Sequence, residues 1–105
     1  MEITDPRFMA RADAHIDLSN RQCSEAHAGS VTLSMIDASC RFSVWLWAVA
    51  SKDVEHLKSQ HAEARQALLE ETARRFDKHF DQYVANYEPY IMAQRRAAEQ
   101  AQSPS

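Results

Sequence analysis

The chain has 105 residues, a net charge of −3 and a single glycine, with 45% hydrophobic and 26% charged residues. Phosphate-binding loops and nucleotide fingerprints need several glycines, so the composition excludes them, and the mildly acidic balance argues against a nucleic-acid-binding protein. The size fits one domain, and the abundance of Ala, Glu, Gln and Arg favours helices.

The first predicted helix begins at Asp5-Pro6, where an N-cap acceptor precedes a proline at the first helical position. Its apolar residues recur at spacings of three and four as far as Ala26. We expect Gly29 to end this helix in a left-handed conformation and Ser30 to cap the next helix. The pattern therefore predicts a tight antiparallel helical hairpin about Gly29.

The second predicted helix runs from about Val31 to Ala50 and has two nearly opposite apolar faces. At about 100° per residue, one face holds Val31, Met35, Ala38, Phe42, Trp45 and Val49, and the other holds Leu33, Ile36, Cys40, Val44 and Trp47. Asp37 and Arg41 lie between the faces with the spacing of an ion pair. They also argue against a membrane span, because each would cost roughly 2.5–3.5 kcal/mol at the centre of a bilayer.

A long third helix is predicted from about Val54 to Tyr87, after the capping residues of the segment 51–53. Its apolar stripe drifts slowly around the helix, as in left-handed packing against neighbouring helices. Glu70 with Arg74 and Glu71 with Arg75 have the spacing of ion pairs on or beside its exposed side. The pattern leaves open whether the helix is broken near residues 79–81. Glu88-Pro89 is expected to end it, because proline disfavours helix in the residue before it.

These elements predict an all-α fold with an antiparallel helical hairpin and one long C-terminal helix in a small bundle. The bundle has three helices, or four if the last one is broken. Residues 1–92 are predicted to form a single helical domain, and the polar residues 93–105 a flexible tail.

Residue spacings typical of catalytic or metal sites are scarce. Helical di-iron sites need Glu-x-x-His pairs, and the sequence contains none. Cys23 and His27 are four residues apart but have no second pair, and no Gly-x-Ser-x-Gly motif is present. We expect no metal and no cofactor, and the sequence favours a protein that is not an enzyme.

The two cysteines, Cys23 and Cys40, fall in different predicted helices. The chain opens without the basic segment, apolar stretch and cleavage site of a secretory signal. We therefore expect a cytoplasmic protein with free thiols.

The first functional hypothesis is a non-catalytic interaction module that forms a homodimer or binds another protein. Its predicted interface is one face of the second helix, formed by Leu33, Ile36, Val44 and Trp47. Trp45 points about 200° away from Trp47 and is expected in a core shared with the first helix. A monomer whose first and third helices cover the two faces is the alternative that the sequence leaves open.

The second hypothesis is a small-molecule or enzymatic pocket between the second and third helices. Its walls would be Trp45 or Trp47 and Tyr83 or Tyr87, and its polar anchor would be Asp13 or Arg41. Ligand sites in helical bundles combine an apolar lining with a few polar groups in this way.

Three segments together resemble a family. They read RADAHIDLSNRQ (11–22), SMIDASCRFSVWLWAVAS (34–51) and FDQYVANYEPYI (80–91). In this order and spacing they resemble the bacterial domain-of-unknown-function family DUF 3144, over residues 7–92. The family-like positions are Arg11, Ala12, Asp13, Asn20, Arg41, Phe42, Asp81 and Tyr83. The Trp45/Trp47 pair and the Ser-Pro-Ser end depart from the family pattern. The resemblance implies an all-helical, cytoplasmic bacterial protein without an assigned activity.

Overall fold

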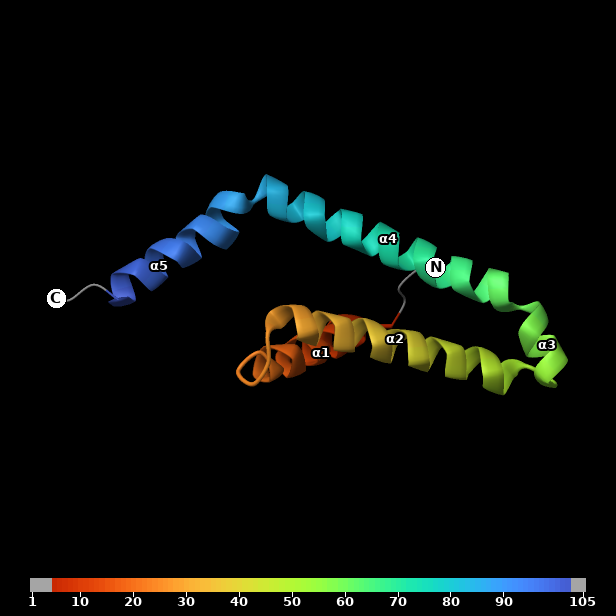
Figure 1. Cartoon of the computed structure of the whole chain (residues 1–105). Coiled ribbons are helices and arrows are strands. Elements are labelled where there is room, and N and C mark those ends of the chain that lie inside the picture. Colours follow the sequence, from red (N-terminus) through yellow and green to blue (C-terminus); the bar gives the residue numbers. More distant parts are fainter. Residues whose placement is uncertain (1–4, 103–105) are drawn as a thin grey trace. The chain divides into compact units, whose positions relative to one another are not determined.

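The computed structural model describes residues 5–102, and its regular structure is helical (Figure 1). In chain order the elements are α1 (Phe8–Gln22), α2 (Ala28–Ala50), α3 (Val54–Ser59), α4 (His61–Ala85), the π-helical turn η1 (Glu88–Met92) and α5 (Ala93–Gln102). No strand occurs within this range, which confirms the all-α class. The chain divides into two compact units, Met1–Leu57 and Lys58–Ser105. The predicted domain of residues 1–92 and its flexible tail remain predictions.

The start of the first helix differs from the prediction, because the N-cap of α1 is Arg7 rather than Asp5 and the α-helix begins at Phe8, after a turn. The Asp5 Oδ1 atom accepts a hydrogen bond from the backbone N–H of Arg7 at 2.8 Å, and the other carboxylate oxygen pairs with Arg11. These partners stabilise the charged carboxylate and hold the pKa of Asp5 below its ordinary value of 3.8. The hydrogen bond and the ion pair of Asp5 therefore hold the turn that precedes α1.

The loop between the first two helices differs from the prediction. Gly29 does not end α1, and its φ is not positive. It lies in the first turn of α2, which begins at Ala28. The N-cap is His27 rather than Ser30, and its Nδ1 accepts a hydrogen bond from the Gly29 N–H at 3.0 Å. A Cβ atom at Gly29 would lie only 3.1 Å from that nitrogen. The glycine therefore leaves room for the imidazole to cap the helix.

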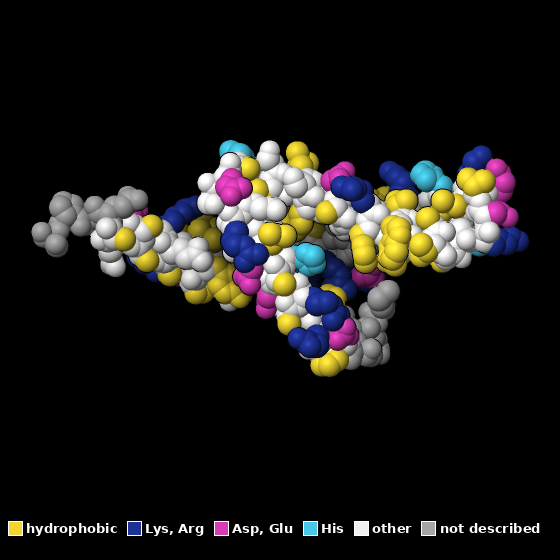
Figure 2. Space-filling model, turned by 90° about the horizontal axis from the view of Figure 1, so that it is seen from below, with side chains coloured by type: hydrophobic (Ala, Val, Ile, Leu, Met, Phe, Trp, Pro, Cys, Tyr) yellow, Lys and Arg dark blue, Asp and Glu magenta, His cyan; other side chains and the backbone are white. Residues whose placement is uncertain are grey.

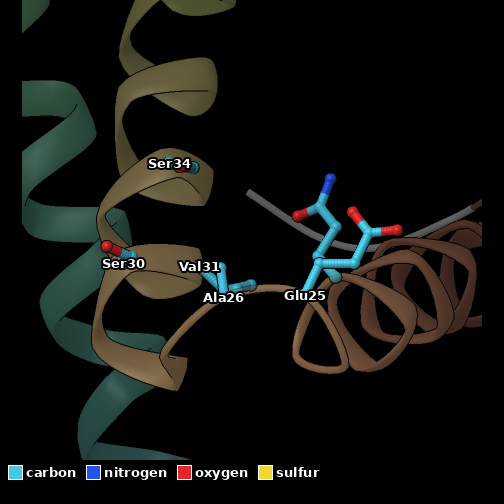
Figure 3. Close-up of a pocket in the computed structure, with 6 residues that line it drawn as sticks. Glu25, Ala26, Ser30, Val31 and Ser34 are labelled. Carbon is cyan, nitrogen blue, oxygen red and sulfur yellow. The ribbon is translucent and has the colours of Figure 1, made fainter.

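In the first unit, α1 and α2 touch near this loop, where Val31 is buried (Figure 3). Beyond the loop α1 diverges from α2, as the close-up shows. The side-by-side packing expected of an antiparallel hairpin is therefore not present along the two helices. One consequence is that α1 covers the first turns of α2 and leaves the rest of that helix open.

The predicted third helix is interrupted earlier than expected. Asp53 caps α3 by accepting a hydrogen bond from the His56 N–H at 2.7 Å, as the capping pattern predicted. The helix then breaks at Gln60, where ψ is 0°, and α4 runs without interruption through residues 79–81. Neither glycine nor proline is present at the break, and nothing in the local sequence accounts for it.

The second unit continues as helix beyond Pro89. Asn86 ends α4 by donating from its side chain to the Gln82 carbonyl at 2.9 Å. Pro89 lacks an amide hydrogen, and it lies in the wide turn η1 instead of ending the helical segment. The residues expected to fray form α5, because Ala, Gln, Arg and Glu are good helix formers. The Ser-Pro-Ser end, residues 103–105, lies outside the described residues.

Candidate functional site

Exposed apolar side chains are the dominant surface feature. Within residues 5–101, Val31 is the only buried hydrophobic residue, with 5% of its surface exposed. Most large hydrophobic residues on α1, α2 and α4 are 38–68% exposed, and Figure 2 shows such side chains gathered over α2 on the face in view. In folded proteins, large contiguous apolar patches are typical of surfaces that a protein, a membrane or a ligand covers.

The predicted interface on α2 is open for most of its length. Leu33, Ile36 and Val44 are all exposed, whereas Trp47 at its far end is half-buried. The Ser51 hydroxyl donates a hydrogen bond to the Trp47 carbonyl at 2.8 Å, which ties the end of α2 to the segment before α3. Whether this face meets a partner remains a prediction.

The opposite face of α2 differs from the expectation for Trp45. The Trp45 side chain is 56% exposed rather than buried against α1. Its ring lies beside that of Phe42, with centroids 5.7 Å apart. The physical reason is the divergence of α1, which leaves the C-terminal half of α2 without a neighbour in this unit. Apart from the half-buried Trp47, both faces of α2 are therefore open at this end.

In the second unit, α4 carries one continuous apolar stripe, which we call the α4 stripe. Its members are Leu69, Phe76, Phe80, Tyr83 and Val84, and all are exposed. The Phe76 and Phe80 rings stack with centroids 5.9 Å apart, and the Tyr83 ring meets that of Tyr90 edge-on at 5.0 Å. The aromatic side chains are thus ordered along one side of the helix.

Charged residues cover the opposite side of α4. Glu71 binds two cations, Arg74 at 2.6 Å and Arg75 at 3.4 Å, and the pair with Arg75 was predicted from its spacing. The hydrogen bond from Arg74 holds the pKa of Glu71 below its ordinary value of 4.5. Glu70 does not pair with Arg74 as expected; it accepts a hydrogen bond from Gln66 at 2.9 Å. Two faces of sharply different polarity result.

The residues of the hypothetical pocket are divided between the two units. Asp13, Arg41 and Trp45 belong to the first unit, and Tyr83 and Tyr87 to the second. Asp13 is exposed on α1, and Arg41 forms the predicted pair with Asp37 at 3.8 Å. Tyr87 contacts the Arg95 guanidinium, which lies 5.9 Å from the ring centroid. The pocket remains a prediction.

A shallow hollow of about 270 Å³ lies where α1, the loop and α2 meet (Figure 3). Its lining residues are Gln22, Glu25, Ala26, Ser30, Val31 and Ser34. Glu25 is its one ionisable side chain, and its volume is below the usual range of about 300–1,000 Å³ for ligand pockets. No pattern in the sequence indicates this hollow, because it depends on the path of the loop.

The described residues offer no set of three His, Cys, Asp or Glu side chains arranged to hold a metal ion. Cys23 and Cys40 are both exposed free thiols. None of the described helices is both long enough and apolar enough to cross a bilayer.

A family model described as "Protein of unknown function (DUF3144)" matches residues 8–84. The chain belongs to the DUF3144 family. This confirms the resemblance drawn from the sequence. No curated protein and no solved structure matches the chain. The matched segment of this DUF3144 protein begins with α1 and ends one residue before the end of α4, so it contains both exposed apolar helices.

Proposed function

We propose that this DUF3144 protein is a self-associating helical module whose task is protein interaction rather than catalysis. The observation that carries the proposal is the contrast between one buried hydrophobic side chain, Val31, and the exposed apolar faces of α2 and α4. Copies of the chain that cover these faces would supply the core that each copy lacks.

The balance between conformational entropy and the burial of apolar surface favours association of the chains. Ordering each residue of a chain costs roughly 1–2 kcal/mol of conformational entropy, and burial of apolar surface is the main term that offsets it. Fully burying one Leu, Ile, Val or Phe side chain contributes about 1.5–3 kcal/mol. Because the helices within each unit bury so little among themselves, association stabilises the folded chain, and folding and assembly become linked.

The proposal includes the α2 face formed by Leu33, Ile36, Val44 and Trp47. Three of these side chains are exposed over more than half of their surface. The charged pair Asp37–Arg41 lies beside this face rather than on it, so it can stay in water when the face is covered. Such an arrangement, with an apolar centre and a charged rim, is typical of protein interfaces.

The proposal also sets the protein in the cytoplasm of a bacterium. Its support is the pair of exposed free thiols, Cys23 and Cys40, since a reducing compartment keeps such thiols from pairing. The family resemblance implies the same setting.

The test is size-exclusion chromatography with light scattering, combined with circular dichroism over a dilution series. We expect a mass that is a multiple of the 12.0 kDa chain at tens of micromolar, and a helical signal that falls as the assembly dissociates. A fully helical monomer at every concentration would contradict the proposal. A control in 6 M urea gives the signal of the unfolded chain.

A further inference from the structure

We infer that the α4 stripe pairs with the α4 stripe of a second copy, with the two helices parallel and in register. The inference rests on the proposed self-association and names the contact that would produce it. Two observations carry it: the seven-residue spacing of the side chains on α4, and the distribution of charge on the two sides of the stripe.

The side chains on one side of α4 recur every seven residues in two series. One series is Ala62, Leu69, Phe76 and Tyr83, and the other is Gln66, Ala73 and Phe80. The offset from the first series to the second is four residues, so they correspond to the d and a positions of a heptad repeat. We call these seven residues the α4 seam. A helix with such a seam matches the left-handed packing of a coiled coil.

The two edges of the α4 seam differ in charge. One edge is formed by the residues directly after those of the first series, and it carries Glu63, Glu70 and Asp77. The other edge is formed by the residues directly before those of the second series, and it carries Arg65 and His79. Arg65 has no ion pair within residues 5–102, and its guanidinium is therefore available to a partner. One edge is acidic and the other is basic.

This asymmetry distinguishes the two orientations of a pair of identical helices. In a parallel pair, each edge meets the opposite edge of the other helix, so Arg65 lies beside Glu70 of the second copy. In an antiparallel pair, like edges meet, and Glu70 faces an acidic side chain such as Asp77 of the second copy. The parallel pair gains two ion pairs by symmetry, and the antiparallel pair places carboxylates against each other.

Gln66 favours the same arrangement. It is the polar member of the α4 seam, and its side chain reaches Glu70 at 2.9 Å within one helix. In a parallel, in-register pair the two Gln66 amides lie opposite each other and can exchange hydrogen bonds. A polar residue at a single seam position fixes register in this way. In an antiparallel pair Gln66 would instead face apolar or aromatic side chains.

Charge reversal tests the orientation by the sign of the effect. We expect Glu70→Arg and Arg65→Glu each to raise the dimer dissociation constant about tenfold, and the double variant to recover most of the loss. Analytical ultracentrifugation of the full chain measures these constants. Lys78→Glu is the matched control for Arg65→Glu, because it makes the same charge change on the side of α4 away from the seam. An antiparallel pair predicts the opposite sign for Glu70→Arg, which would strengthen association.

Disulfide cross-linking tests the orientation of the two helices directly. In a background with Cys23→Ser and Cys40→Ser, Ala62→Cys at the start of the seam should give a covalent dimer on mild oxidation. Ala67→Cys, on the opposite side of α4, should not. In an antiparallel pair centred on the helix the two Ala62→Cys thiols would be more than roughly 30 Å apart, and no covalent dimer would form.

The outcomes separate this inference from the proposed function. The parallel pairing would be wrong, and self-association would stand, under three results together. The native chain is an oligomer, the Ala62→Cys variant forms no disulfide-linked dimer, and Glu70→Arg lowers the dissociation constant. A native chain that is monomeric would overturn both. A dimer that forms the disulfide and recovers with the double variant would establish the parallel α4 pair.

Discussion

The helices α2 and α4 are almost equal in length, 23 and 25 residues, but they present their apolar side chains differently. On α4 the apolar residues form a single stripe with acidic, basic and neutral residues around it. On α2 they occupy two opposite faces, and Asp37 and Arg41 are its only charged residues. One covering helix therefore suffices for α4, whereas α2 needs neighbours on both sides.

The two helices differ in how they can select a partner and its orientation. Charge at the edges of the α4 stripe discriminates between orientations of a partner, because like charges oppose one arrangement and opposite charges favour the other. The flanks of α2 offer little such discrimination, so the shape of its aromatic and aliphatic side chains must choose the partner. We expect α4 to set the orientation of an assembly and α2 to add most of its buried surface.

The largest expected effect comes from a charge placed in the α4 stripe. We expect Phe80→Asp to raise the dissociation constant at least about 100-fold, which corresponds to about 2.7 kcal/mol, because it removes an aromatic side chain and buries a carboxylate. Sedimentation analysis measures the change. Ala67→Asp adds the same charge to the opposite side of α4 and should have little effect.

The matching substitution on α2 tests the contrast between one apolar face and two. Val44→Asp charges one apolar face and leaves the face of Phe42 and Trp45 intact. We therefore expect a smaller loss, about tenfold in the dissociation constant. If Val44→Asp weakened association as much as Phe80→Asp, the distinction between one face and two would be wrong.

The two tryptophans give the next effect in size. Because Trp45 is more exposed than the half-buried Trp47, we expect Trp45→Ala to weaken assembly more and Trp47→Ala to lower the melting temperature more. The sequence pattern alone predicts the reverse. Measuring the dissociation constant and the thermal midpoint for each variant decides between the two assignments, and equal effects on both quantities would contradict either one.

The capping histidine provides a local test of α2 that leaves α4 untouched. We expect His27→Ala to destabilise the start of α2 by about 0.5–2 kcal/mol, the usual cost of a lost N-cap. His27→Asn keeps a capping acceptor and should retain most of the stability. Hydrogen exchange of the first-turn amides, including that of Gly29, measures both changes.

The smallest effect concerns the outer face of α4. The pKa of Glu71 is lowered in the folded chain, so its stabilising contribution is complete above about pH 4.5 and is lost as the pH falls through the folded pKa. Glu71→Gln should remove this part of the acid dependence of the helical signal. The dissociation constant at neutral pH should change little, since Glu71 lies away from the stripe.

Much of the local structure could be predicted from the sequence. Periodicity gave the all-α class, the end of α2 at Ala50 and the ion pairs of Asp37 and Glu71, because these depend on contacts within one helix. The capping of α2 was missed because histidine is an uncommon N-cap and Gly29 looked like a helix end. The path of α1 was missed for a different reason, since helical periodicity does not specify the direction in which a loop sends the next helix.

The candidate surface was predicted in part. The exposed side chains of Leu33, Ile36 and Val44 follow from their position on a second apolar face of α2. The exposure of Trp45 could not be predicted in the same way, because it depends on how far α1 accompanies α2. The apolar pattern shows which residues need cover and does not show which segment supplies it.

The π-helical turn η1 has a further consequence for the length of any α4 pairing. A π turn holds about one more residue than an α turn, so the side chains that follow it are rotated by roughly 100° from the phase of α4. The residues of α5 therefore leave the line along which α4 presents its apolar side chains. Glu88–Met92 acts as a fixed end point, which limits a paired helix to the extent of α4 and directs α5 toward a different neighbour.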